Sequence, residues 1–368
     1  MNNPTPDDVR YMARAIALAG RGLNTTDPNP RVGCVLVKDG RVVGEGWHQR
    51  AGEPHAEAHA LNAAGADARG ATAYVSLEPC CHHGRTPPCS QALIQAGVAR
   101  VVAAMPDPNP RVACRGFAEL ERAGIHVDTG LLQAEAEGLN PGFISRMTRA
   151  RPYVRVKLAA SLDGRTALAS GESKWITGEP ARADVQRLRA RSAAILTGIG
   201  TVLADDPSLT VRDLDINRQP LRVVLDTQLQ MSPQARMLSL PGTTLVISGA
   251  HGADQAAALR AAGAEVLCLP GDRGVVDLTA LVRHLAVREV NELLVEAGAT
   301  LSGALLKAGL VDELIVYLAP HLLGVSARGM FNITGIETMT DRIAIEIQDV
   351  RAVGKDWRIT ASVKNPSP

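Results

Sequence analysis

The chain has 368 residues, of which 46% are hydrophobic and 21% charged, so we expect a soluble globular protein of about two domains. Its 39 basic and 38 acidic residues leave a net charge of +1, which creates no field that would attract nucleic acid or an anionic membrane. Aromatic residues make up only 3%, which also disfavours a surface that stacks bases, so we expect a small molecule as the partner.

The predicted location follows from what the chain lacks. No apolar stretch reaches the ~18 residues that span a bilayer, because the longest candidate, at about 293–323, is interrupted by Glu296, Lys307, Asp312 and Glu313. The first residues carry two acids and no basic-then-apolar run of the kind that opens a secretory signal. We therefore expect a cytoplasmic protein without membrane contact, whose six cysteines are core residues or metal ligands rather than disulfides.

The first half alternates between helix and strand patterns. Apolar residues at helical spacing open the chain, and an Asp39-Gly40 turn between two β-rich runs predicts a hairpin. The predicted elements are a helix at 7–20, the hairpin at 31–48, a helix at 55–65, a strand at 73–79, a helix at 90–97 and a strand at 99–105. This alternation indicates an α/β fold.

A break follows at about 138–152, where prolines, glycines and arginines gather and the periodicity is lost. A new series of β/α signals begins at 152–164, so the chain is divided into domains of residues 1–149 and 150–368. Further strands are predicted at 193–198, 221–226, 243–248, 265–269, 292–298 and 313–320. A Rossmann site is not supported, because the GIG at 198–200 lacks the third glycine of the fingerprint.

Two short stretches of the first domain carry metal-ligand side chains. In HAEAH (55–59), His55 and His59 are four residues apart and could share a metal, or His55 could act with Glu57 as in the H-x-E of zinc deaminases. Pro54 favours the second interpretation, because proline is common at the start of helices and leaves His55 at or just outside the first turn. His59 then lies one turn deeper, as a core or supporting residue.

The second stretch, PCCHHGRTPPC (79–89), supplies the sulfur ligands. Adjacent Cys80 and Cys81 cannot both reach one ion without strain, whereas Cys89 stands just before a predicted helix whose positive end lowers the pKa of a thiol. We therefore choose His55, Cys80 and Cys89 as zinc ligands, with Glu57 as an unligated general acid and base.

His55-Ala-Glu57 together with PCCHHGRTPPC resembles the deaminase half of the RibD family of bifunctional riboflavin-biosynthesis proteins, which have this long loop in place of P-C-x-x-C. The resemblance implies a cytidine-deaminase-like α/β/α domain. It also implies a substrate, 2,5-diamino-6-(5-phosphoribosylamino)-4(3H)-pyrimidinone, that loses its 2-amino group by hydrolysis. Asn29 is then expected to hold the pyrimidine and His82 to line the pocket.

The second domain has weaker local signals. Residues 292–309 read as an apolar strand, an acid and a glycine-opened helix, which can bind an anion but in many α/β proteins serves only packing. Polar residues also gather within 157–178 and 197–212 without a packing reason. The arginine-rich helix at 182–191 is by itself typical of a solvated face, although a phosphorylated substrate needs at least one bidentate arginine.

These stretches resemble the reductase half of the same family, which is similar in fold to dihydrofolate reductase and uses NADPH to reduce the ribosyl group of the deaminated product. The resemblance implies cofactor contacts at Ala159, Trp175, Thr201, Asp205, Thr227, Gly298, Ala299, Thr300, Leu301, Ser302, Gly303 and Ala304. It implies substrate contacts at Ser173, Arg189, Leu209, Arg212 and Glu296, with Lys157, Asp205 and Glu296 as unranked ionisable groups near the hydride step. The product is 5-amino-6-(5-phosphoribitylamino)uracil.

Some alternatives stay open. DPNPRVGC (27–34) recurs as DPNPRVAC (107–114), so either one turn was used twice or both loops face one ligand; Cys114 stands where the family more often has glycine. The chain could also be a deaminase of another small pyrimidine or purine with a non-catalytic second domain. A zinc-stapled structural protein would need a closed site that includes His59 or Cys81. We also expect a homo-oligomer.

Overall fold

A computed structural model describes residues 4–81, 88–110, 112–214, 216, 218–250 and 252–364. By its internal contacts the chain divides into two compact units, Met1–Ala150 and Arg151–Pro368, which we describe one at a time. None of the described helices is both long and apolar enough to cross a bilayer.

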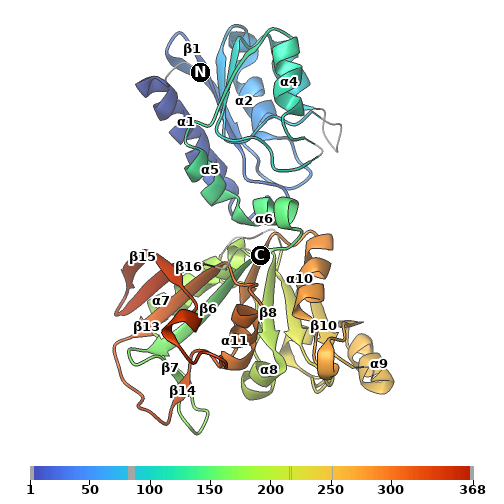
Figure 1. Ribbon diagram of the computed structural model, residues 1–368. Coiled ribbons are helices and arrows are strands. Elements are labelled where there is room, and N and C mark those ends of the chain that lie inside the picture. Colours follow the sequence, from blue (N-terminus) through green and yellow to red (C-terminus); the bar gives the residue numbers. More distant parts are fainter. Residues whose placement is uncertain are drawn as a thin grey trace. The chain divides into compact units, whose positions relative to one another are not determined.

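The first unit is built on a five-stranded sheet of order β2-β1-β3-β4-β5 (Figure 1). Its elements are α1 (Pro6–Ala19), β1 (Gly33–Lys38), β2 (Arg41–Trp47), α2 (Ala56–Ala64), β3 (Thr72–Val75), α3 (Cys89–Ala96), β4 (Arg100–Ala103), α4 (Arg115–Arg122), β5 (His126–Thr129), α5 (Gln133–Leu139) and α6 (Pro141–Arg149). The predicted hairpin is confirmed as β1 and β2, and Asp39 and Gly40 both have the positive φ that a tight hairpin turn requires.

Helices cover both faces of this sheet, because successive strand residues point to opposite sides. Cys34 and Leu36 of β1 pack on one side with α2, α3 and α4, whereas Val35 and Val37 pack on the other with α1 and α5. The unit is therefore the expected α/β/α sandwich, with α2 and α3 on the same face of the sheet.

The stretch without sequence periodicity contains a helix that we did not predict. Pro141 occupies the first turn of α6, where its missing N–H costs nothing. Phe143 and Ser145 are buried, while the basic residues of the last turn are Arg146 and Arg149. The helix is too short and too polar for its pattern to stand out from a linker.

Asp8 of α1 joins that helix to the sheet, and we expect its loss to weaken the first unit. Burial raises the pKa of this carboxyl, but hydrogen bonds from Arg100, Thr5 and Tyr74 outweigh burial and hold the pKa well below its usual range. Asp8→Asn should lower the free energy of unfolding at pH 7 by about 2 kcal/mol, measured by urea denaturation.

The pH dependence of that loss has a definite sign. Because the folded pKa is depressed, the stabilisation is complete above the unfolded value of ~3.9 and disappears as the pH falls toward the folded value. The gap between the native chain and Asp8→Asn should therefore shrink steadily below about pH 4. Asp7→Asn, which changes a 67% exposed carboxylate beside Arg10, is the control and should behave like the native chain.

The second unit has a nine-stranded sheet of order β11-β10-β9-β8-β12-β6-β13-β16-β15. Its main elements are β6 (Tyr153–Ser161), β7 (Arg165–Ala167), α7 (Glu179–Arg191), β8 (Ala194–Gly198), α8 (Ile199–Asp205), β9 (Leu221–Leu225), β10 (Thr244–Ser248), α9 (Ala253–Ala261), β11 (Glu265–Cys268), α10 (Leu278–Val287), β12 (Glu292–Val295), α11 (Ala299–Lys307), β13 (Glu313–Ala319), β14 (Arg328–Gly329), β15 (Ile345–Val353) and β16 (Asp356–Val363). The strands from β11 to β13 pair in parallel, and the final hairpin adds two antiparallel strands.

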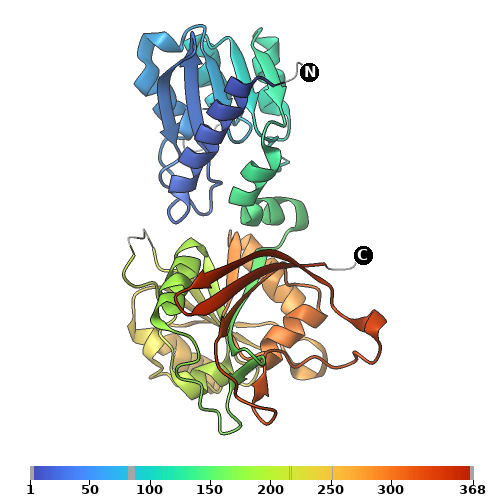
Figure 2. The same cartoon turned by 90° about the vertical axis from the view of Figure 1, so that its left-hand side faces the viewer.

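Here too the sheet is covered on both faces. Leu196 of β8 packs with α10 and α11, while its neighbour Ile195 packs with α7 and α9. The central strands β8, β9, β10 and β12 are thus buried on both sides, which explains why they read as continuous apolar runs. In Figure 2 the hairpin of β15 and β16 forms the dark red end of this sheet.

Candidate functional site

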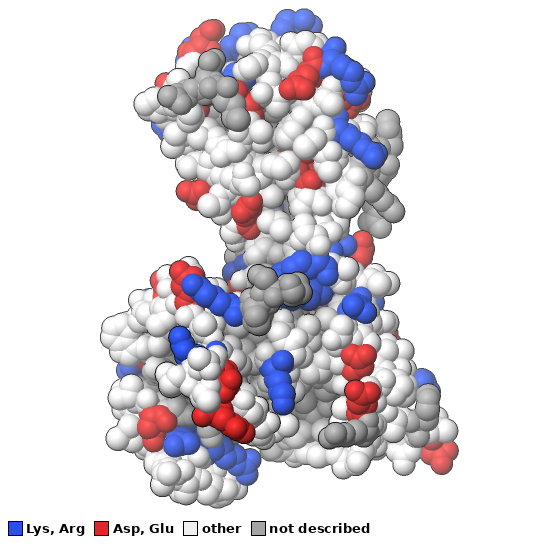
Figure 3. Space-filling model, in the orientation of Figure 1, with Lys and Arg blue, Asp and Glu red and all other residues white. Residues whose placement is uncertain are grey.

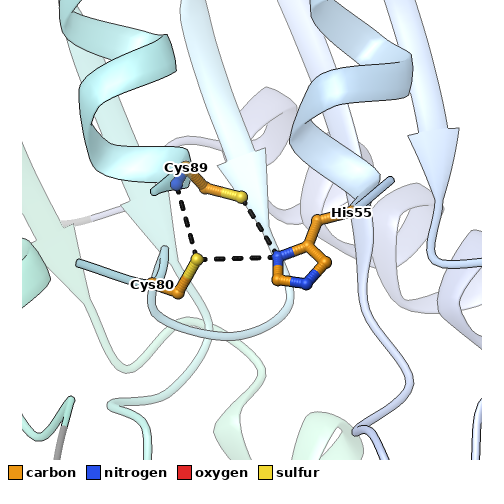
Figure 4. A group of neighbouring side chains, drawn as sticks. All are labelled: His55, Cys80 and Cys89. Atoms are coloured by element: carbon orange, nitrogen blue, oxygen red, sulfur yellow. Dashed lines mark hydrogen bonds between the residues drawn. The ribbon is translucent and has the colours of Figure 1, made fainter. Parts of the chain in front are cut away.

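His55, Cys80 and Cys89 converge in the first unit (Figure 4), and their ligand atoms all lie within 4.8 Å of one another. His55 Nδ1 is 3.6 Å from Cys80 Sγ and 3.3 Å from Cys89 Sγ. His55 is the N-cap of α2 and Cys89 the first residue of α3, so two helix N-termini point toward the cluster. The structure brings together the three residues chosen from the sequence.

Two glycines of β2 set the position of α2. An added Cβ on Gly44 would lie 2.2 Å from the carbonyl oxygen of Ala60, and one on Gly46 would lie 2.4 Å from Cβ of His59. Any larger side chain would push the helix away from the sheet. His59 thus faces β2, and among the described residues neither His59 nor Cys81 joins the group of His55, Cys80 and Cys89.

Glu57 lies in the first turn of α2 and is only 3% exposed. Burial raises the pKa of its carboxyl, and its Oε2 has no hydrogen-bond partner in the described part of the chain. Hydrogen bonds from Cys89 and His55 hold the pKa of the Cys80 thiol well below its usual range. One imidazole and two thiols are donors that zinc prefers, and three protein ligands leave the fourth position open, so the cluster fits a catalytic zinc ion.

Two further residues extend the cluster. The His48 ring is 5.2 Å from that of His55, edge to face, and its Nδ1 donates to the Pro54 carbonyl at 3.1 Å. Its Nε2 therefore accepts from the side-chain amide of Asn29, also at 3.1 Å. Sequence reasoning selected Asn29 but missed His48, whose only signal was its place at the end of the predicted hairpin. His82, the other expected substrate contact, lies outside the described residues.

The second group of expected residues lies where parallel strands end. Lys157 and Ala159 are on β6, Glu296 follows β12, Thr227 follows β9, and Thr201 is on α8 just after β8. Because β9, β8, β12 and β6 are neighbours, these carboxyl ends lie at one edge of the sheet. Gly198 and Gly298 are the N-caps of α8 and α11, and an added Cβ on Gly198 would lie 3.6 Å from Leu301.

The residues of α11 have different surroundings. Ser302 is fully buried, and its Oγ has no partner among the described atoms. An added Cβ on Gly303 would lie 2.3 Å from the carbonyl oxygen of Asn332, so this glycine serves packing. In the first turn of α11, from Ala299 onward, the backbone N–H groups are the ones that can bind an anion.

Arg189 and Glu296 form a two-pronged ion pair, with Nε to Oε1 at 2.5 Å and Nη2 to Oε2 at 3.0 Å. Both side chains are nearly buried, and Nη1 of Arg189 also donates to the Thr210 carbonyl. Burial lowers the pKa of nearby Lys157, whereas the charges of Arg189 and Lys157 outweigh burial to lower the pKa of Glu296. The guanidinium of Arg189, an expected substrate contact, is thus paired with Glu296.

The remaining expected residues make contacts with other side chains. Leu209 is buried beside Thr210, and the backbone N–H of Arg212 donates to the Gln186 side chain on α7. Ser173 and Trp175 lie between β7 and α7, where the 69% exposed Trp175 stacks under the guanidinium of Arg182. Asp205 closes α8 and pairs with Lys174 at 2.9 Å.

Surface charge is mixed. On the face drawn in Figure 3, basic and acidic side chains are interspersed over each unit, in keeping with a net charge of +1. The ion pairs along the chain, such as Arg14 with Glu45 and Arg288 with Glu265, join charges of opposite sign.

Comparison with known families covers both units. Residues 5–105 match the family of the cytidine and deoxycytidylate deaminase zinc-binding region, and residues 152–359 match the RibD C-terminal domain. The chain is 54% identical over 361 residues to riboflavin biosynthesis protein RibD of Escherichia coli, covering 95% of this chain and 97% of that protein. It is 47% identical to the protein of the same name from Haemophilus influenzae, covering 97% and 98%.

Solved structures agree over the same length. A structure of Acinetobacter baumannii RibD has a TM-score of 0.90 at 46% identity and covers 97% of this chain and 99% of that one. A diaminohydroxyphosphoribosylaminopyrimidine deaminase/5-amino-6-(5-phosphoribosylamino)uracil reductase from Thermotoga maritima has a TM-score of 0.85 at 32% identity, with coverages of 97% and 99%.

Proposed function

The chain belongs to the RibD family of riboflavin-biosynthesis proteins, and on that premise we propose that it catalyses two consecutive steps. The first unit deaminates 2,5-diamino-6-(5-phosphoribosylamino)-4(3H)-pyrimidinone by hydrolysis. The second reduces the ribosyl group of the product with NADPH and gives 5-amino-6-(5-phosphoribitylamino)uracil. The observation that carries the proposal is the convergence of His55, Cys80 and Cys89 beside buried Glu57, in a chain whose other half is a reductase domain.

We assign the deaminase chemistry to residues 1–149. His55, Cys80 and Cys89 would hold zinc, which when bound supplies a water that is acidic enough to attack at neutral pH. The carboxylate of Glu57 takes a proton from the attacking water and gives it to the ring nitrogen. It then takes the proton of the hydroxyl added to the ring carbon and gives it to the amino group, which leaves as ammonia when its bond to that carbon breaks. Its burial supports this role, because a raised pKa brings a carboxyl closer to the operating pH.

His48 lies against the ring of His55 and is hydrogen-bonded to Asn29, so both residues join the cluster on its imidazole side. We propose that Asn29 and His48 contact the pyrimidine ring of the substrate. The Asn29 amide has both donor and acceptor atoms for a ring edge, and its bond to His48 fixes which way it points. His82 is assigned to the same pocket by resemblance alone.

We assign the reductase chemistry to residues 150–368. NADPH supplies the hydride, and the N-terminal turns of α8 and α11, with Ala159, Trp175, Asp205 and Thr227, hold the cofactor. Lys157, Ser173, Arg189, Leu209, Arg212 and Glu296 contact the substrate. Within this set, partly buried Lys157 is the group most able to move a proton, because desolvation lowers the pKa of its ammonium.

The proposal is tested by supplying the diaminopyrimidinone ribosyl phosphate with and without NADPH. Ammonia should be released in both cases. When NADPH is present, its oxidation should follow the release of ammonia. Nicotinamide oxidation without ammonia would contradict the order of steps. A deaminase of another base with an inert second domain would release ammonia and never oxidise NADPH.

We further propose that the protein is a homo-oligomer that associates through β15 and β16. β15 is the edge of the large sheet, and its pairing with β16 places Ile345, Ile347, Val350 and Trp357 on one face, each about half exposed. An apolar edge strand of this kind is normally covered. Ile347→Asp should convert the oligomer to a monomer in size-exclusion chromatography with light scattering, whereas Glu346→Asp should not; a native monomer would contradict this proposal.

The cytoplasmic location and the absence of a nucleic-acid partner stay predictions.

A further inference from the structure

Glu78 stands two residues before a proposed zinc ligand, and its carboxylate is enclosed by backbone N–H groups. Oε2 accepts from Asp107 N and Cys114 N, both at 3.0 Å, and Oε1 accepts from Gly116 N at 2.9 Å. The side chain is 3% exposed. No part of the chemistry assigned above uses this carboxylate.

The donors come from the segment that repeats the DPNP motif and from the first turn of α4. Cys114, the N-cap of α4, supplies no side-chain cap, so the carboxylate of Glu78 takes that place from outside the helix. The first turn of α4 packs closely against the segment of Glu78 and Pro79. An added Cβ on Gly116 would lie 2.1 Å from the carbonyl oxygen of Pro79 and 3.1 Å from Oε1 of Glu78.

This contact bears directly on Cys80. After β3 ends at Val75, the chain reaches Cys80 in irregular backbone, and Pro79 has no N–H with which to fix it. The backbone N–H of Glu78 donates to the Met105 carbonyl, and the Cys80 carbonyl accepts from Ser90 N at 3.1 Å. Between these two backbone contacts, the side chain of Glu78 binds the segment to the start of α4.

We propose that Glu78 is a positioning residue of the deaminase site, which fixes the Cys80 thiol by binding the start of α4. The repeated DPNP motif then has two different uses: Asn29 of the first copy reaches the cluster through His48, and Asp107 of the second copy helps to hold the segment that carries Cys80. This inference rests on the proposed zinc site.

The test is Glu78→Gln in the full-length protein. A glutamine has one acceptor oxygen, and its NH2 group would face an N–H donor, so the segment should shift. We expect zinc to be held about 10–100-fold less tightly in competition with a chromophoric chelator, as for other residues that orient metal ligands. The cobalt(II)-substituted protein should show altered ligand-field and thiolate-to-cobalt bands, while reductase turnover on the deaminated substrate stays native.

A second variant and a control separate positioning from folding. Gly116→Ala leaves Glu78 intact but forces apart the same contact, so it should weaken zinc binding in the same direction. Glu121→Gln, on the exposed side of α4, should change neither zinc affinity nor the cobalt spectrum. If Glu78→Gln does not fold, Gly116→Ala decides alone.

Native zinc affinity and a native cobalt spectrum in the folded variants would overturn the inference, even if their melting temperatures fall, because a merely stabilising carboxylate would give that result. Failure of the native chain to bind zinc or cobalt would instead refute the proposed zinc site, so the two failures are distinguishable.

Discussion

Glu57→Gln should lose hydrolytic deamination by about 10²–10⁴-fold in kcat while it keeps its zinc and its reductase activity. Glutamine is nearly the same size and fits the same buried place in α2, but it cannot take a proton from the attacking water or return one to the leaving group. Ammonia release from the diaminopyrimidinone substrate measures the loss. Metal analysis measures the zinc, and NADPH oxidation with the deaminated substrate measures the second activity.

A matched variant shows whether the effect belongs to this position. Glu135→Gln makes the same chemical change on an exposed carboxylate of α5 and should deaminate at the native rate. Full deaminase activity in Glu57→Gln would remove Glu57 from the mechanism. Loss of zinc together with activity would mean that the carboxylate supports the metal rather than the proton transfers.

How much of this site was predictable depends on how local its chemistry is. His55, Glu57, Cys80 and Cys89 could be chosen because ligand-type residues at such spacing, beside prolines and helix starts, seldom gather for packing alone. Hydrophobic runs bounded by turns likewise identified most strands of both sheets, although β5, β15 and β16 were not predicted. In each case the signal lies within a short window of the sequence.

What sequence reasoning missed depends on contacts between distant segments. His48 reaches the cluster because β2 carries it past the Asn29 loop, and Glu78 meets α4 about forty residues further along the chain. Helix α6 escaped notice because tertiary packing of Phe143, rather than a periodic pattern, sustains it. The pairing of Arg189 with Glu296 joins residues 107 positions apart, and neither residue's neighbours in sequence reveal it.

That pair leads to the second large effect, which we expect in Arg189→Met. Removing the guanidinium leaves Glu296 nearly buried without its main partner, so the free energy of unfolding of the second unit should fall by about 3–5 kcal/mol. Urea denaturation of the full-length protein measures the fall. Reductase activity should be lost, whereas ammonia release by the first unit should persist in conditions where the second unit stays folded.

The double variant Arg189→Met, Glu296→Leu decides what the pair is for. Replacing a buried ion pair by apolar side chains of similar volume is often neutral for stability, so the double variant should recover most of the lost free energy. If both residues contact the substrate, kcat/KM for its reduction should still be down by about 10–100-fold, the cost of a lost charged hydrogen bond. A stable double variant that reduces the substrate at the native rate would show that Arg189 and Glu296 serve only the fold, and that Lys157 acts without them.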